Sequence, residues 1–172
     1  VAEHHNYFAN GVLVHNCIII DDPIDPHGAR SDAELDNADK FMTDVIPSRK
    51  TDKAVTVTIL VMQRIHFRDP TAVMLREAKK EGAAPVRQIC LPGELYRGAD
   101  GAWDVANVNP PELACRYVGG LLDPARLSPA VLAEYRARGA HFYSTQVLQN
   151  PIPPGGGAFK SQWFSLTTKA AP

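Results

Sequence analysis

Residues 54–62, AVTVTILVM, constrain the fold more than any other part of the sequence. The run is rich in Val, Ile and Thr, which favour strands. Because it is too continuously apolar for a strand with one solvated face, it resembles the core strand of a sheet covered on both sides. Asp69-Pro70 then supplies a helix N-cap and a proline at the first helical position, which predicts a helix that ends before Gly82. A strand followed by a helix indicates an α/β fold.

A second apolar run, residues 18–20, stops at Asp21-Asp22-Pro23. We expect a buried strand that delivers two adjacent acids to its C-terminal edge, where ligands bind in open α/β sheets. In nucleotide hydrolysis one carboxylate can hold Mg²⁺ and the other can orient the attacking water. We therefore assign Asp21 to the metal and Asp22 to the water. The alternative is that Asp-Asp-Pro is only a favourable turn sequence.

Capping residues mark the starts of two further helices. Ser31, with Glu34 three positions on, matches a capping box. Ser128 precedes a proline, and Gly139 stands where a left-handed C-cap is expected. The remaining predicted elements are a helix over 31–42, a strand over 86–91, a short strand over 102–105, a helix over 129–138 and a helix over 142–148.

The composition excludes several classes of protein. A hydrophobic fraction of 45% and a charged fraction of 22% disfavour disordered, coiled-coil and collagen-like chains. The net charge of -1 gives no overall attraction to nucleic acid, so any DNA contact comes from a local patch or another domain. Three cysteines, an odd number, favour a reducing cytoplasm over a secreted disulfide framework. No apolar run approaches the roughly 18 residues that span a bilayer, so we expect no membrane partner.

The triplet His15-Asn16-Cys17 carries chemistry that ordinary structure does not need. The Asn16 amide can attack its own main-chain carbonyl, which closes a succinimide and cuts the chain after Asn16. His15 is placed to assist that cyclisation, and the Cys17 thiolate can accept an acyl group. The alternative is a glycine-containing hairpin with chance histidines.

Residues 5–17, HNYFANGVLVHNC, resemble the C-terminal splicing end of inteins, which finish in His-Asn before Cys, Ser or Thr. The resemblance implies that His5 is the upstream histidine that assists cyclisation of Asn16. The intein's N-terminal half, with its own first nucleophile, is absent from the sequence. We therefore expect splicing to need that half as a partner, and we expect the natural start of the protein to lie upstream of Val1.

Residues 18 to about 164 resemble, in the same order, the second half of the ATPase domain of the tailed-phage terminase large subunit. The resemblance implies part of a P-loop-type (RecA-like) sheet with helices on both faces. It also implies that Gln63 and Arg64 sense the nucleotide, whereas the alternative is that they begin a loop and His66 caps or packs. The landmarks are Asp21-Asp22-Pro23, 58–66 (TILVMQRIH), Asp69-Pro70, 88–92 (QICLP), 142–151 (FYSTQVLQNP), 155–160 (GGGAFK) and Trp163-Phe164.

Together these resemblances divide the chain into an intein segment (1–16), part of an ATPase domain (17–150) and a linker toward a nuclease domain (151–172). The implied cofactors are ATP and Mg²⁺, with none for splicing, and the implied setting is the host-cell cytoplasm. The implied partners are double-stranded DNA, the terminase small subunit, the portal and the N-terminal intein half. No Gly-x-x-x-x-Gly-Lys-Ser/Thr loop occurs in the sequence, so we expect the fragment alone to be inactive.

Two other functions fit parts of the sequence. The chain could be the C-terminal partner of a split intein that ligates in trans, although sixteen residues are few for that role. It could also be a fragment of a helicase-like ATPase, which shares the acidic strand end but has no reason to carry the tail at 148–151 (LQNP).

Overall fold

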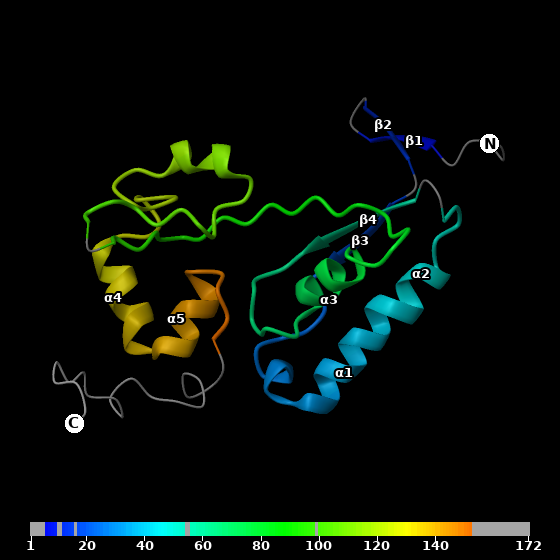
Figure 1. Ribbon diagram of the computed structural model, residues 1–172, viewed down its shortest axis with the longest axis horizontal. Helices are drawn as coiled ribbons and strands as arrows, with labels where there is room; N and C mark the ends of the chain where they lie inside the picture. Colours follow the sequence, from blue (N-terminus) through cyan, green and yellow to red (C-terminus); the bar gives the residue numbers. More distant parts are fainter. Residues whose placement is uncertain (1–5, 10–11, 16, 54–55, 99, 153–172) are drawn as a thin grey trace, which may run out of the picture. The chain divides into compact units, whose positions relative to one another are not determined.

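The computed structural model describes residues 6–9, 12–15, 17–53, 56–98 and 100–152. For residues 6–9 and 12–15 it describes the backbone alone. The chain divides into two compact units, Val1–Gln88 and Ile89–Pro172 (Figure 1). In the described residues, short strands combine with five α-helices, a mixture that fits an α/β class. Across the same residues, no helix has the length and apolar character needed to cross a membrane.

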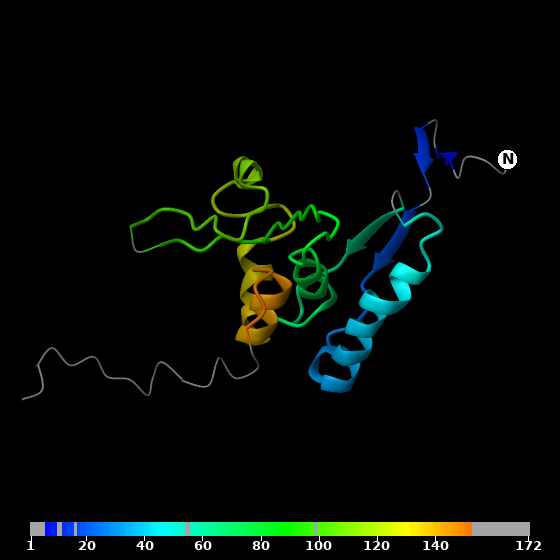
Figure 2. The ribbon, with the colours of Figure 1, turned by 45° about the vertical axis from the view of Figure 1, so that its right-hand side comes forward.

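A two-stranded parallel sheet lies at the centre of the first unit. Strand β3 (Cys17–Asp21) pairs with β4 (Val57–Val61), and Figure 2 shows the two strands side by side. The register sets Ile18 opposite Thr58 and Ile20 opposite Leu60. Both strands predicted for this region are therefore confirmed, and the parallel pairing agrees with a helical crossover between them.

The crossover from β3 to β4 is a helical segment in three parts: α1 (Asp32–Lys40), the π-helical turn η2 (Phe41–Val45) and α2 (Ile46–Ser48). Ser31 caps α1 as predicted, because its Oγ accepts a hydrogen bond from the Glu34 N–H at 3.4 Å. The helical path continues past residue 42, its predicted end. The reason is packing: Met42 and Ile46 both enter the core beside Ile20.

Helix α3 (Pro70–Glu77) follows β4 and completes the core of the first unit. Asp69 caps it as predicted, accepting a hydrogen bond from the Ala72 N–H at 2.9 Å. Val73 of α3 is buried against Ile20, and Leu60 of β4 packs on the same cluster. The helices therefore cover the face of the sheet that carries the even-numbered residues of both strands.

The opposite face of the sheet is open, which corrects the prediction of a strand covered on both sides. Ile19 is 65% exposed, Ile59 is 42% exposed and Val61 is 54% exposed. The expected helices on both faces are likewise not found in the described part of the first unit. The reason is that a continuously apolar strand provides two apolar faces, while the described helices pack on only one of them.

The N-terminal residues form a separate hairpin. Strand β1 (Asn6–Ala9) pairs antiparallel with β2 (Val12–His15), and the register sets Asn6 opposite His15. This hairpin and the β3–β4 pair are two different sheets. Residue 16 therefore separates two β structures that share no hydrogen-bonded ladder.

In the second unit, helix α4 (Pro129–Ala137) begins as predicted, with Ser128 Oγ accepting a hydrogen bond from the Val131 N–H at 3.4 Å. Helix α5 (Ala140–Gln146) begins and ends two residues before its predicted bounds. Gly139 joins the two helices with φ +106° and ψ 159°. Its φ is positive, but its conformation is extended and not the predicted left-handed cap. The core of this unit gathers Leu132, Tyr143, Val147 and Leu148.

The strands predicted over 86–91 and 102–105 are wrong. Isolated bridges are found instead, one between Cys90 and Asn109 and one between Arg97 and Trp103. Ile89 is 63% exposed and Val86 is 36% exposed, so this stretch is not buried as a core strand would be. The other described element of this region is the short 3₁₀ helix η3 (Pro111–Arg116).

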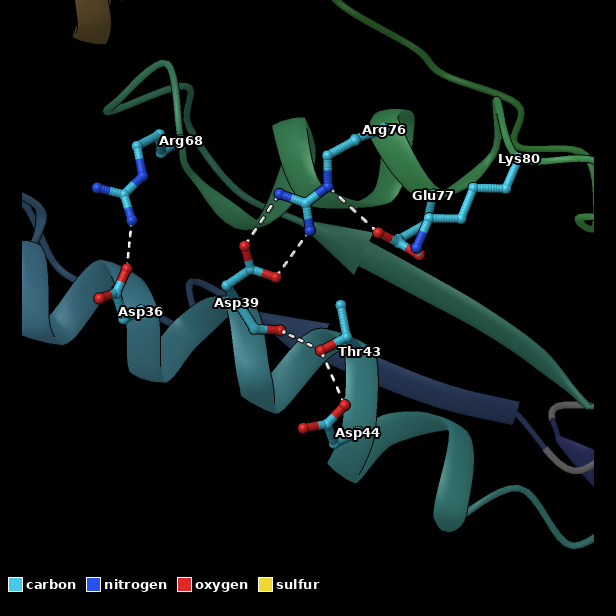
Figure 3. Close-up of polar contacts among 8 residues, drawn as sticks. All are labelled: Asp36, Asp39, Thr43, Asp44, Arg68, Arg76, Glu77 and Lys80. Atoms are coloured by element: carbon cyan, nitrogen blue, oxygen red, sulfur yellow. Dashed lines mark hydrogen bonds and ion pairs between the residues drawn. The ribbon is translucent and has the colours of Figure 1, made fainter.

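Ion pairs connect α1 to α3 and to the loop before it (Figure 3). The guanidinium of Arg76 binds both carboxylate oxygens of Asp39, at 2.9 Å and 2.8 Å. Arg68 pairs with Asp32 at 3.0 Å and also with Asp36. The hydrogen bonds from Arg76 lower the pKa of Asp39 below its ordinary value of 3.8. The pair therefore stabilises the fold only while Asp39 is ionised.

We expect Asp39→Asn to lower the unfolding free energy of the first unit by about 0.5 kcal/mol at pH 7, since the pair is largely exposed. A lowered pKa means that this stability is fully present above pH 3.8 and is lost as the pH falls through the folded-state value. Denaturation midpoints of wild type and variant should converge as the pH falls through the folded-state pKa of Asp39. Asp44→Asn is the control, because Asp44 has no ion pair with a described residue, and it should change little at pH 7. A constant difference across this pH range would contradict the role of the pair.

Candidate functional site

The carboxyl edge of the β3–β4 pair is the candidate site. Asp21 ends β3 and stands opposite Val61, which ends β4. The Asp22 N–H donates a hydrogen bond to the Val61 carbonyl at 3.0 Å, so the ladder extends one residue beyond the strand. The two acids therefore lie at the C-terminal edge of a parallel pair, as predicted, beside the chain that leaves β4 through Gln63.

Both acids present their carboxylates to solvent. Asp21 and Asp22 are exposed, and neither side chain makes an ion pair with a described residue. Asp22 also adopts a positive φ of 39°, a backbone region that Asp tolerates better than most residues. Asp adopts such a conformation in ordinary turns as well as at functional sites, so it also agrees with the alternative that Asp-Asp-Pro forms a turn. The backbone thus turns sharply where the two carboxylates meet solvent.

The acids fit a magnesium ion that is held mainly by other groups. No cluster of three or more His, Cys, Asp or Glu side chains occurs among the residues that the structure describes, so a metal cage made by this protein alone is not seen there. Mg²⁺ commonly binds through one or two carboxylates, with water and substrate phosphates completing its octahedron. Two exposed neighbouring carboxylates match that pattern.

The two residues predicted to sense nucleotide differ in their surroundings. Gln63 is exposed just after β4. The Nε of Arg64 donates to both oxygens of Asp69, at 3.2 Å and 2.9 Å, and its side chain is 18% exposed. Arg64 therefore holds a loop together, which agrees with the structural alternative for this residue. A contact with nucleotide stays a prediction for both.

Asp69 organises the loop between β4 and α3. Its side chain is fully buried, and besides Arg64 it accepts hydrogen bonds from three backbone N–H groups. These donors are Ile65 at 3.2 Å, His66 at 3.4 Å and Ala72 at 2.9 Å. A buried carboxylate requires such compensation. The sequence indicates only that Asp69 caps a helix. The Arg-x-x-x-x-Asp spacing from Arg64 to Asp69 is the signal that could have indicated the ion pair across the loop.

His66 has a structural place in the same loop. It is buried, and its Nδ1 accepts a hydrogen bond from the Arg68 N–H at 3.1 Å. Its ring packs against Phe67, with 4.1 Å between ring centroids. These contacts agree with the alternative that His66 caps or packs.

The predicted splicing residues fall on both sides of the junction. His5 and Asn16 lie outside the described residues. His15 ends β2, and Cys17, a half-buried free thiol, begins β3. Their predicted roles in splicing stay predictions.

Comparison with known protein families, with curated proteins and with solved structures found no match to this chain. The resemblances to inteins and terminases therefore depend on the quoted sequence motifs alone and stay predictions.

We expect Asp69→Ala to lower the unfolding free energy of the first unit by about 3 kcal/mol, because it removes a buried acceptor that Arg64 shares with three backbone N–H groups. Arg64→Met should cost less, since Asp69 keeps its backbone donors. Asp21→Asn is the matched control for loss of an acid; at an exposed site it should stay within about 0.5 kcal/mol of wild type. Denaturant unfolding measures all three. Equal losses for Asp69→Ala and Asp21→Asn would contradict the organising role of Asp69.

Proposed function

We propose that residues 17–150 are the second half of the ATPase domain of a phage terminase large subunit, an ATP-driven DNA-packaging motor. Residues 1–16 would be the C-terminal splicing segment of an intein inserted in that protein. The observation that best supports the motor is the parallel β3–β4 pair, which brings Asp21 and Asp22 to the same edge as Gln63. Ligands of open α/β sheets bind at this edge.

In this proposal the two acids have different roles in hydrolysis. Asp21 would hold Mg²⁺, which when bound neutralises charge on the phosphates. Asp22 would orient the attacking water and accept its proton as the water oxygen attacks the terminal phosphorus. The exposure of both carboxylates supports these roles, since each must reach a ligand outside the described residues.

Gln63 and Arg64 would act differently in the motor. Gln63, exposed two residues after the end of β4, would contact the nucleotide or its water. Arg64 forms an ion pair with Asp69 and would position the loop that leads from Gln63 into α3. A change at the nucleotide would then reach α3 through a loop held by a buried carboxylate. The partial P-loop-type sheet, with its phosphate loop elsewhere in the parent protein, is part of the same proposal.

At the junction, the Asn16 side-chain amide would attack its own carbonyl carbon and break the bond to Cys17, releasing the Cys17 amine. His15 and His5 would assist this step by proton transfer. Before this step, the Cys17 thiolate would take the acyl group of the upstream flanking segment from its ester or thioester with the first nucleophile of the intein, which leaves as a hydroxyl or thiol. After the cut, the Cys17 amine would attack that thioester carbonyl and form the new peptide bond, which frees the thiol. The position of residue 16 between two separate sheets supports this assignment, because excision there would leave the β3–β4 ladder intact.

The nucleotide sequence upstream of residue 1 would distinguish the competing functions. A continuous upstream reading frame with an intein N-terminal half and a phosphate loop would support the motor. A start codon just upstream would support the split intein acting in trans. DNA, small subunit and portal would be partners of the complete motor only.

We expect Asp22→Ala in the spliced, full-length protein to lower ATP turnover by a factor on the order of 10² to 10⁴, because a water-orienting base is lost. Nucleotide binding should be retained, since Asp22 is not assigned to the metal. The matched control is Asp25→Asn, which removes one charge nearby but keeps an acceptor for the His27 and Gly28 N–H groups. Turnover in Asp22→Ala equal to that of the control would reject the assignment.

We expect Asn16→Ala in a reconstituted precursor to abolish cleavage after residue 16, because alanine has no amide to cyclise. Mass spectrometry of the products measures how much of the precursor is cleaved after residue 16. Asn10→Ala, which also removes an amide from this segment, is the control and should still cleave. Cleavage of the Asn16→Ala precursor at the wild-type rate would exclude the splicing assignment without affecting the ATPase one.

A further inference from the structure

One face of the β3–β4 pair is apolar and open to solvent. Side chains alternate between the two faces of a strand, and the register sets Ile19 opposite Ile59, so the odd-numbered residues of both strands share a face. This open face carries Ile19, Val57, Ile59 and Val61, each between 42% and 65% exposed. Because parallel strands are normally covered on both faces, four exposed branched side chains on one face indicate a binding surface.

The proposed acyl acceptor of splicing lies on the same face. Cys17 is the first residue of β3 and stands opposite Val57, and its thiol is free and half-buried. By the alternation along the strand, the Cys17 side chain is on the side of the sheet that carries Ile19. A structure that covers the open face therefore comes to lie beside the thiol that would accept the acyl group.

The upstream half of the proposed ATPase domain is the partner that fits this face. In the spliced parent its last residue would be bonded to the Cys17 nitrogen, so its end would be fixed at the first residue of β3. It would complete the same domain, and an α/β sheet buries its faces against other elements of its own domain. The intein leaves the protein, so a face covered only by the intein would be exposed again in the working motor.

We propose that the upstream half docks on the open face before splicing, and that this docking controls how fast Cys17 receives the acyl group. The inference rests on the proposed splicing of the parent protein. The Cys17 thiolate attacks the upstream ester or thioester carbonyl, a new sulfur–carbon bond forms, and the first nucleophile of the intein leaves and takes up the proton that the thiol gave up. Docking raises the effective concentration of the two reacting groups. The intein is then removed mainly from chains whose two flanking halves already meet.

Lysine substitutions on the open face test the docking in the complete precursor, which contains both flanking halves and the whole intein. Val61→Lys places a charge in the contact, four residues along β4 from the partner of Cys17. It should slow formation of the spliced product about tenfold, because a charge is costly to bury in an apolar contact. Val61→Thr keeps the branched shape and should slow splicing less, which keeps the test valid if lysine weakens the fold. Val118→Lys is the matched control: Val118 is 67% exposed in the second unit, and this variant should splice at the wild-type rate.

A second precursor distinguishes the partners that could cover the face. In it an unrelated folded domain replaces the upstream half, while the residues next to the junction are kept. This precursor should splice more slowly than the natural one, and Val61→Lys should change its rate no further. If Val61→Lys slowed it equally, the intein would cover the face, and if the natural precursor spliced faster at higher protein concentration, a second copy would cover it. Either result overturns the proposal.

The outcome for the face variants also separates this inference from the splicing assignment. Wild-type rates in Val61→Lys and Val61→Thr, from a natural precursor that splices, overturn the docking proposal and leave the assignment of Asn16 and Cys17 intact. A natural precursor that forms no spliced product rejects that assignment, and this inference with it. The rates are measured by mass spectrometry of products sampled over time, so ATP turnover does not enter the comparison.

Discussion

The contacts of one buried carboxylate determine how the strand-to-helix turn of the first unit is built. Asp69 has no exposed surface, and it gathers the Arg64 guanidinium with three backbone N–H groups. Without these donors, a buried charge would be strongly unfavourable. The same carboxylate caps α3 and fixes the path of the chain where it leaves β4. The path of the chain from Arg64 into α3 therefore depends on a residue that does not belong to the acidic edge.

The open face of the β3–β4 pair follows from the same construction. The crossover helices and α3 meet on one side of the sheet, where Ile20 is buried. On the other side, Ile19 and Val57 remain more than half exposed. Parallel strands are normally covered on both faces, so this apolar surface is unusual for a complete sheet. The proposed ATPase sheet would account for it, because further layers of a RecA-like domain would cover that face.

Local signals predicted more of this fold than long-range ones. Ser31, Asp69 and Ser128 each accept the N–H that capping predicts, since a cap acts within one helical turn. The strand expected over 86–91 failed because a strand needs a neighbour, and a single sequence does not display one. Likewise the place of the two acids followed from the apolar run before them. The full set of hydrogen-bond donors to Asp69 could not be predicted from a local pattern, because it depends on how the loop after β4 folds back.

The position of the proposed splice junction, just before β3, determines which strand pairings splicing would disturb. Cys17 begins β3 and Asp21 ends it, so about 13 Å of strand separates the proposed splicing chemistry from the proposed hydrolytic chemistry. The hairpin before residue 16 pairs only with itself, and every described ladder bond of β3 goes to β4. Removing the hairpin would thus break no described strand pairing in the parallel sheet. In the proposed splicing, the peptide bond that breaks at the downstream junction lies just before the first residue of β3, so the edge that carries the acids would keep its register with β4.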